Sequence, residues 1–249
     1  MVCEAFSQGE SIVHGLDARA RVVVAAVFTC LVAVSQNFAV MGAGLALSTL
    51  GVGVARLPLR AVLRRLVGVN VFVAMLWVML PLSSRGTPLV HVGGLVYSRE
   101  GALLAAAITL KANAIVLALA VLLGTMEMTT LGHALWHLRV PEKLTHLFLL
   151  TVRYIDVLHH EYERLRKAMR VRCFRPGMNL HTYKSFGYLV GMLLVKSVAR
   201  AERVVAAMKC RGFHGRFHVF DHFVFGRRDA VFVAGAAIVC GLMLVAELL

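Results

Sequence analysis

Five apolar runs constrain most strongly what this chain of 249 residues can fold into. A helix needs about 17 to 25 mostly apolar residues to cross a bilayer. The first run reaches that length only if its helix begins near Arg19. Hydrophobic residues make up 59% of the chain and charged residues only 16%, which excludes an ordinary soluble domain. The sequence therefore predicts an all-α integral membrane protein of about five spans. These are Val22–Ser35, Phe38–Ala55, Leu66–Leu82, Ala102–Gly124 and Ala230–Leu249.

The placement of Lys and Arg predicts the orientation of the chain. Arg56–Arg65 holds four arginines and no acid, and residues 125–229 hold two thirds of all Lys and Arg. Because cytoplasmic loops are enriched in these residues, we expect the N-terminus and residues 125–229 in the cytoplasm. The polar, acid-containing N-terminus shows no signal-peptide pattern. We therefore expect a multi-pass protein of a bacterial or archaeal cell (inner) membrane.

These signals divide the chain into three parts. They are a four-span bundle (1–124), a cytoplasmic module (125–229) and a closing span (230–249). Pro141, Pro176–Gly177 and Gly212 divide the module into long helices. Apolar residues repeat at steps of three and four along both helices, so we expect the helices to pack along these stripes. The stripes are Ile155, Leu158, Tyr162, Leu165 and Met169, then Val190, Leu194, Ser197, Ala201, Val204 and Met208.

A short basic phrase occurs twice in the module, once near the end of each long helix. AMRVRCF covers Ala168–Phe174, and AMKCRGF covers Ala207–Phe213. An arginine can be placed in a last turn by the helix dipole alone. Two copies at equivalent positions instead indicate a duplicated docking element, because a guanidinium group binds carboxylates or carbonyls in a bidentate manner. We therefore expect Arg172 and Arg211 to meet two similar partner surfaces.

The sequence resembles the transmembrane T component of energy-coupling factor (ECF) transporters, in the cobalt and nickel branch of CbiQ-type proteins. HGLDARAR (His14–Arg21) is similar to that family's entrance to the first span, with Ala18 where proline is usual. Leu138–Leu144, Thr151–Glu161 and above all Arg200–Phe217 resemble its cytoplasmic helices. The doubled phrase resembles its two Ala-Arg-Gly coupling motifs.

This resemblance implies a non-catalytic scaffold within an ATP-driven importer. Two ABC-type ATPase subunits bind ATP and Mg, and a separate membrane subunit binds the substrate. That subunit is of the CbiM type, with or without a small CbiN-type subunit. The implied cargo is cobalt or nickel ions, which links the transporter to cobalamin biosynthesis. This chain itself is expected to bind no cofactor or metal, and to contact membrane lipid but not nucleic acid.

Carried over to this chain, Arg172 engages one ATPase subunit and Arg211 the other. Val171, Cys173, Cys210 and Gly212 complete the implied docking set. Cys173 departs from the family pattern because it stands where glycine is typical. A residue with a Cβ restricts a left-handed helix cap. We therefore expect the two caps to differ and the two docks to be unequal in strength.

Other interpretations of the chain remain open at this point. A T component of a vitamin-type ECF transporter fits the same motifs. An integral-membrane enzyme acting on lipid phosphates would use the arginines and histidines of residues 125–229. His133 and His137, or His159 and His160, have spacings that could hold a metal. The sequence contains no GxxxxGK[ST], GxSxG or HExxH motif, so ATP must be hydrolysed by another protein.

Lys111 is a charge inside the fourth apolar run. A charged side chain there costs about 2.5 kcal/mol or more unless it faces protein or water. We expect a structural partner within the bundle or on the substrate subunit, with Asp17 and Glu127 as candidates.

Overall fold

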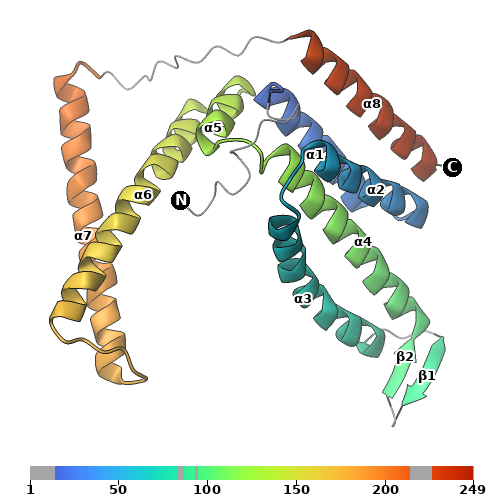
Figure 1. The fold of residues 1–249 in the computed structure, drawn as a ribbon, viewed down its shortest axis with the longest axis horizontal. Helices are drawn as coiled ribbons and strands as arrows, with labels where there is room; N and C mark the ends of the chain where they lie inside the picture. Colours follow the sequence, from blue (N-terminus) through green and yellow to red (C-terminus); the bar gives the residue numbers. More distant parts are fainter. Residues whose placement is uncertain (1–14, 84–86, 93–94, 214–225, 249) are drawn as a thin grey trace. The chain divides into compact units, whose positions relative to one another are not determined.

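The computed structural model describes residues 15–83, 87–92, 95–213 and 226–248. Its helices are α1 (Ala18–Val34), α2 (Phe38–Val54), α3 (Leu59–Ser83), α4 (Arg99–Leu122), α5 (Met128–His137), α6 (Glu142–Val171), α7 (Leu180–Cys210) and α8 (Arg227–Leu248) (Figure 1). The predicted all-α fold is confirmed. The segment between α3 and α4 contains a short antiparallel hairpin, β1 (Pro88–Val92) and β2 (Leu95–Ser98).

The chain forms two compact units. A membrane unit contains α1 to α5, the β-hairpin and α8, and a hairpin unit contains α6 and α7. The boundary lies between Leu138 and Arg139, so α5 belongs to the first unit and not to the predicted cytoplasmic module. The reason is local packing, because Ala134 of α5 shares a buried cluster with Ala18 and Met126.

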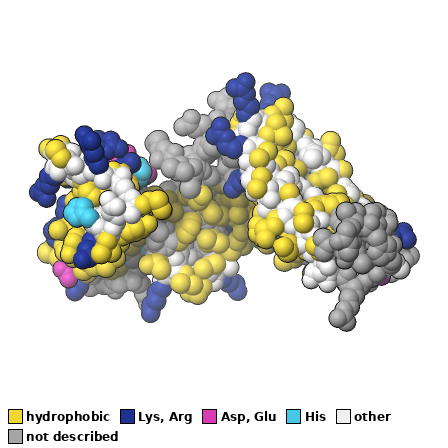
Figure 2. Space-filling model, turned by 90° about the horizontal axis from the view of Figure 1, so that it is seen from below, with side chains coloured by type: hydrophobic (Ala, Val, Ile, Leu, Met, Phe, Trp, Pro, Cys, Tyr) yellow, Lys and Arg dark blue, Asp and Glu magenta, His cyan; other side chains and the backbone are white. Residues whose placement is uncertain are grey.

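Each predicted span corresponds to a helix of the membrane unit. Three described helices are long and apolar enough to cross a membrane: α3, α4 and α8. Helices α1 and α2 have 17 residues each and are about 26 Å long, slightly shorter than the hydrocarbon core. The structure thus shows a multi-pass membrane protein, and the count of five spans stays a prediction. Hydrophobic side chains cover much of the described surface of this unit (Figure 2).

Helix α4 is the centre of the membrane unit and packs against α1, α2 and α3. Ala114 and Ala118 of α4 meet Phe28 and Val32 of α1 in one apolar cluster. Asn37 ends the turn between α1 and α2 and caps α2, since its side chain accepts a hydrogen bond from the Ala39 amide (3.0 Å). Helices α1 and α2 are therefore joined by a short turn at Ser35–Asn37.

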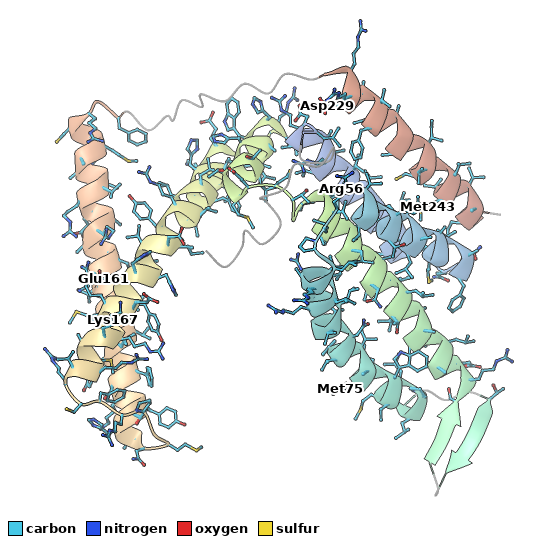
Figure 3. The ribbon with its side chains drawn as sticks, viewed as in Figure 1. Arg56, Met75, Glu161, Lys167, Asp229 and Met243 are labelled. Atoms are coloured by element: carbon cyan, nitrogen blue, oxygen red, sulfur yellow. The ribbon has the colours of Figure 1, made fainter. Side chains whose placement is uncertain are left out.

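Buried polar groups join the start of α1 to α4 and α8. Asp17 caps α1 by accepting a hydrogen bond from the Arg19 amide (2.9 Å), and its own amide donates to Asp229 Oδ1 of α8 (2.8 Å). Arg21, only 3% exposed, donates from Nη1 to Thr125 Oγ1 (2.9 Å), just beyond α4. Figure 3 labels Asp229 at the start of α8. The HGLDARAR stretch thus ties three helices together.

Lys111 finds its partner at the other end of α1. Its Nζ donates a hydrogen bond to the Ala33 carbonyl oxygen (2.8 Å), in the last turn of α1, where the helix dipole is negative. The expectation of a structural partner within the bundle is confirmed, but Asp17 and Glu127 as that partner are wrong. Asp17 lies at the opposite end of α1, about 24 Å along the helix axis from Ala33.

Candidate functional site

The hairpin unit carries both copies of the doubled phrase. Its two helices, α6 and α7, run antiparallel, and they cross where Lys196 Nζ donates a hydrogen bond to Glu161 Oε1. Figure 3 labels Glu161 at this crossing. Glu161 is 8% exposed although it is a carboxylate, so the pairing with Lys196 compensates for its burial. No spacing rule relates residues 35 positions apart, so this pair could not be predicted from the sequence.

The environment of Glu161 keeps it ionised. The hydrogen bond from Lys196, assisted by the charges of Lys196, Arg164 and Arg200, holds the pKa of this carboxylate below its ordinary value. Arg164 Nη1 lies 3.5 Å from the other carboxylate oxygen. The ion pair therefore stabilises the crossing above the ordinary carboxylate pKa. That stabilisation is lost as the pH falls through the lowered pKa.

A groove of about 520 Å³ lies between α6 and α7, near the turn that joins them. Leu165 and Met169 of α6 line it with Leu189 and Met192 of α7. Phe174 closes the turn, because its ring packs edge-on against that of Phe186 (centroids 5.9 Å apart). The expectation that the two helices pack together is confirmed over this stretch.

The predicted stripe on α7 is wrong by about one position at its start. Val190 and Leu194 are 57% and 64% exposed, whereas the adjacent Leu189 is buried. On α6, Ile155 is 60% exposed. The helices cross instead of running side by side along their length. Their contact is therefore confined to the region around the crossing and the turn, and stripe residues such as Ile155 do not pack against the other helix.

At the end of α6 the backbone forms a Schellman cap. The Phe174 amide donates to the Met169 carbonyl (3.1 Å) and the Cys173 amide to the Arg170 carbonyl (3.0 Å). Arg172 is the C-cap residue, and Cys173 follows with a left-handed φ of 60°. The cap ends the helix with the Arg172 side chain on the surface, at the rim of the groove.

At the end of α7 the same cap recurs atom for atom. The Phe213 amide donates to the Met208 carbonyl (3.0 Å) and the Gly212 amide to the Lys209 carbonyl (3.0 Å). Arg211 is the C-cap residue, and Gly212 follows with a φ of 79°. The cap at Cys173 therefore forms with the same backbone geometry as the cap at Gly212, and the predicted difference in strength between the two docks stays a prediction. Cys173 adopts the left-handed conformation because the two cap hydrogen bonds require it.

All six residues predicted from the doubled phrase lie on the surface of the hairpin unit. They are Arg172, Val171, Cys173, Arg211, Cys210 and Gly212. The two arginines are at opposite ends of the hairpin, since Arg172 stands at the turn and Arg211 at the far end of α7. Arg172 is 11 residues beyond the crossing at Glu161 and Arg211 is 15 residues beyond it at Lys196, which separates the two arginines by about 40 Å along the hairpin. The structure thus presents two like ends far apart and not one composite site.

A long apolar surface also lies on α7 between the two arginines. Tyr183, Tyr188, Val195 and Val198 are each at least 52% exposed. The sequence predicts a single apolar stripe on this helix, whereas its first half is apolar on several sides. Such a surface is typical of a protein or membrane contact.

The described histidines engage in local contacts. His159 Nε2 lies 3.6 Å from Glu163 Oε1, and His160 Nδ1 contacts the Asp156 carbonyl oxygen (2.7 Å). Among the residues that the structure describes, no group of three or more His, Cys, Asp or Glu side chains could hold a metal ion.

The sequence was compared with known proteins. A profile of the CbiQ family, described as a cobalt transport protein, matches residues 9–219. The chain belongs to the CbiQ family. The matched range contains both Schellman caps of the hairpin unit and most of the membrane unit, so family membership rests on the whole architecture and not on one motif.

Individual relatives agree with this membership. The chain is 24% identical over 236 residues to the energy-coupling factor transporter transmembrane protein EcfT of Acidaminococcus fermentans, covering 90% of this chain and 88% of that protein. It is 26% identical over 231 residues to EcfT of Bacillus subtilis, covering 86% and 85%. An uncharacterized protein of Methanocaldococcus jannaschii is 30% identical over 97 residues, 39% of this chain and 36% of that protein.

Proposed function

We propose that this chain is the T component of an ECF-type importer and joins two ATPase subunits to a substrate-binding membrane subunit. The observation that carries the proposal is the identical arginine cap at both ends of one hairpin, about 40 Å apart. One binding site on one partner would not contact two equivalent caps that lie so far apart, so a single partner does not explain both. Two copies of one partner explain both caps. The relatives named EcfT are components of energy-coupling factor transporters.

In this proposal the hairpin unit transmits movement and the membrane unit anchors it. Arg172 and Arg211 each enter a groove of one ATPase subunit and bind carboxylates or carbonyls there. ATP and Mg are bound and used by those subunits, and this chain has no catalytic role. The exposed apolar surface of α7 meets the substrate-binding subunit. The crossing at Glu161 and Lys196 couples one end of the hairpin to the other.

The substrate that we propose is cobalt or nickel ions. Support comes from the family description as a cobalt transport protein. The EcfT relatives carry no ion in their names, so a vitamin-type transporter is the alternative. Uptake of labelled cobalt, nickel and vitamins by cells that produce the complete transporter separates the two, because the substrate subunit alone selects the cargo.

Charge reversal tests the docking role. In Arg172→Glu or Arg211→Glu, we expect one ATPase subunit to be lost from the purified complex, and in the double variant both, together with uptake. The ratio of ATPase to T component after affinity purification measures this. Arg166→Glu and Arg203→Glu are matched controls, because both arginines are exposed on the same helices away from the caps.

The controls should copurify both ATPase subunits and transport normally. If the double variant retains both subunits at the ratio of the unmodified protein, the docking role of these arginines is wrong. Thermal unfolding of each purified variant shows whether the hairpin unit is still folded.

A further inference from the structure

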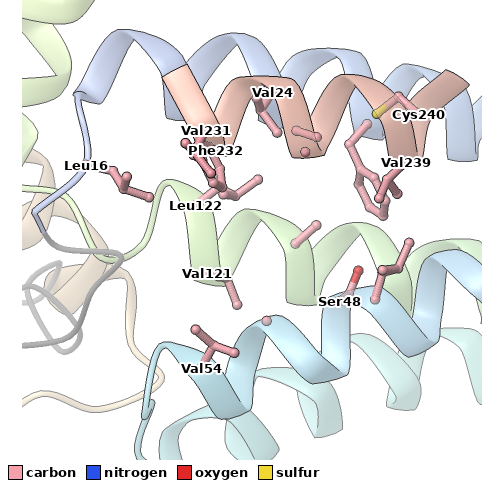
Figure 4. Close-up of a pocket in the computed structure, with 16 residues that line it drawn as sticks. Leu16, Val24, Ser48, Val54, Val121, Leu122, Val231, Phe232, Val239 and Cys240 are labelled. Carbon is pink, nitrogen blue, oxygen red and sulfur yellow. The ribbon is translucent and has the colours of Figure 1, made fainter. Parts of the chain in front are cut away.

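The membrane unit contains an apolar crevice beneath α8. It has a volume of about 420 Å³ and lies between α8 and helices α1, α2 and α4 (Figure 4). Phe28, Gly51 and Ala118 line it from the bundle, and Phe232 and Gly235 line it from α8. Its volume is within the range of ligand pockets.

Helix α8 is held against the bundle at its start and again over its second half, where Met243 is buried against Phe28 and Val32. At its start, Asp229 accepts hydrogen bonds from the amides of Asp17 (2.8 Å) and Gly226 (2.9 Å). At its other end, Glu247 accepts one from the Gln36 amide (2.6 Å) and one from the Ser35 hydroxyl. Between these ends small side chains leave space. A Cβ atom added at Gly235 would meet no atom within 4 Å.

The lining of the crevice selects an apolar occupant. Ser48 contributes a hydroxyl group, which donates to the Gly44 carbonyl (2.8 Å) and so is already satisfied. The remaining lining is of aliphatic and aromatic side chains, glycines and Cys240. In a bilayer, lipid tails are the apolar molecules that surround α8, and an empty apolar space beside them loses dispersion contacts.

The mouth of the crevice at the start of α8 is basic. Arg227 and Arg228 are exposed, and they precede the lining residues Val231 and Phe232 by one helical turn. Residues four apart share a helix face, so Arg227 and Arg228 occupy the same faces of α8 as Val231 and Phe232, one turn nearer its start. The neighbouring carboxylate of Asp229 is buried and accepts two backbone hydrogen bonds, which leaves the exposed charge positive.

We propose that this crevice binds one acyl chain of an anionic phospholipid, with the phosphate at Arg227 and Arg228. The lipid fills the gap between the two anchored ends of α8 and completes the packing of that helix. This site is independent of the proposed transport role, because it rests on α8 and the bundle and uses no residue of the hairpin unit.

The test measures lipid retained by the purified full chain. The protein is exchanged from mixed vesicles of phosphatidylglycerol and phosphatidylcholine into detergent, and native mass spectrometry counts the bound lipid. We expect one retained phosphatidylglycerol. Gly235→Leu should abolish its retention by filling the crevice. Gly241→Leu is the matched control, since Gly241 is on α8, outside the crevice, with the same free space at its Cβ.

The basic mouth is tested separately. Arg227→Gln and Arg228→Gln should each lower the preference for phosphatidylglycerol over phosphatidylcholine by about fivefold, since a basic residue at an anionic membrane surface contributes about 1 kcal/mol. In a chain with Trp77 and Trp136 replaced by phenylalanine, Phe232→Trp, which changes the volume of the crevice wall little, should remain quenched by brominated phosphatidylglycerol after transfer to detergent. Ile238→Trp, which is 64% exposed, should not. This quenching comparison stays informative if Gly235→Leu fails to fold.

Three results would overturn the proposal. Equal retention by Gly235→Leu and the unmodified chain would mean that the lipid is bound elsewhere. Equal retention of phosphatidylglycerol and phosphatidylcholine would mean that the retained lipid is unspecific lipid from around the protein. If a substrate-binding subunit displaced the lipid when added, the occupant of the crevice in the complex would be a helix of that subunit.

Discussion

Cys173 adopts a backbone conformation that is usual for glycine. It lies in one of two caps that are otherwise identical. Its φ of 60° lies in the left-handed region, where a residue with a Cβ loses about 1 to 2 kcal/mol. Gly212 occupies the equivalent position without that cost. The two caps therefore share their geometry and differ in strain. Because the cap after Arg172 is strained and the cap after Arg211 is not, we expect the cap that positions Arg172 to be the less stable of the two.

Two reciprocal substitutions measure that strain. Cys173→Gly should raise the free energy of unfolding of the hairpin unit by about 1 kcal/mol, and Gly212→Ala should lower it by a similar amount. A Cβ at Gly212 meets no atom within 4 Å, so the second effect is purely conformational. Thermal unfolding of the purified chain checks both changes. Equal stability of Cys173→Gly and the unmodified protein would show that the left-handed cap carries no strain.

At the scale of elements, the register of α6 against α7 could not be predicted from the sequence. Hydrophobic periodicity shows which face of each helix is apolar, but not which residues meet across two helices. The pair Glu161 and Lys196, together with Phe174 and Phe186 at the turn, determines that register. It places Leu165 beside Met192, in one groove. Val204 is two helical turns beyond Lys196, away from the turn.

Disulfide crosslinking tests this register. In a background with the five native cysteines replaced by serine, Leu165→Cys with Met192→Cys should crosslink rapidly on mild oxidation. Leu165→Cys with Val204→Cys is the control and should not, because its residues lie about 18 Å apart along the helix axes. A shift in gel mobility reports the bond. The reverse outcome, with only the Val204 pair reacting, would mean that the hairpin has another register.

At the scale of the whole molecule, the two units differ in what surrounds them. The membrane unit exposes apolar residues such as Val71, Phe72 and Met75 of α3, as expected for contact with lipid. The hairpin unit combines basic residues with exposed apolar ones. Because Lys and Arg accumulate in cytoplasmic segments, we expect the hairpin unit inside the cell and the segment between α3 and α4 outside.

Labelling of single cysteines determines this orientation. A chain whose one cysteine is Cys173 should react with a membrane-impermeant maleimide only after intact cells are made permeable. A cysteine-free chain with Thr87→Cys should react in intact cells, since Thr87 is exposed and precedes β1 in the segment predicted to be outside. Labelling of Cys173 in intact cells would reverse the predicted topology.

The sequence alone predicts the five apolar runs, the breakers between the long helices and the doubled basic phrase of this CbiQ-family chain, but it places the start of α3 at Leu66 and not at Leu59. Apolar periodicity, helix caps and breakers act between residues a few positions apart, so they can be recognised without a fold. Only the tertiary structure decided that Lys111 pairs with Ala33, that α5 belongs to the membrane unit, and that α8 leaves a crevice at Gly235. Each of these depends on which side chains meet across distant parts of the chain. Such contacts follow from the packing of whole helices and are not encoded in any local pattern.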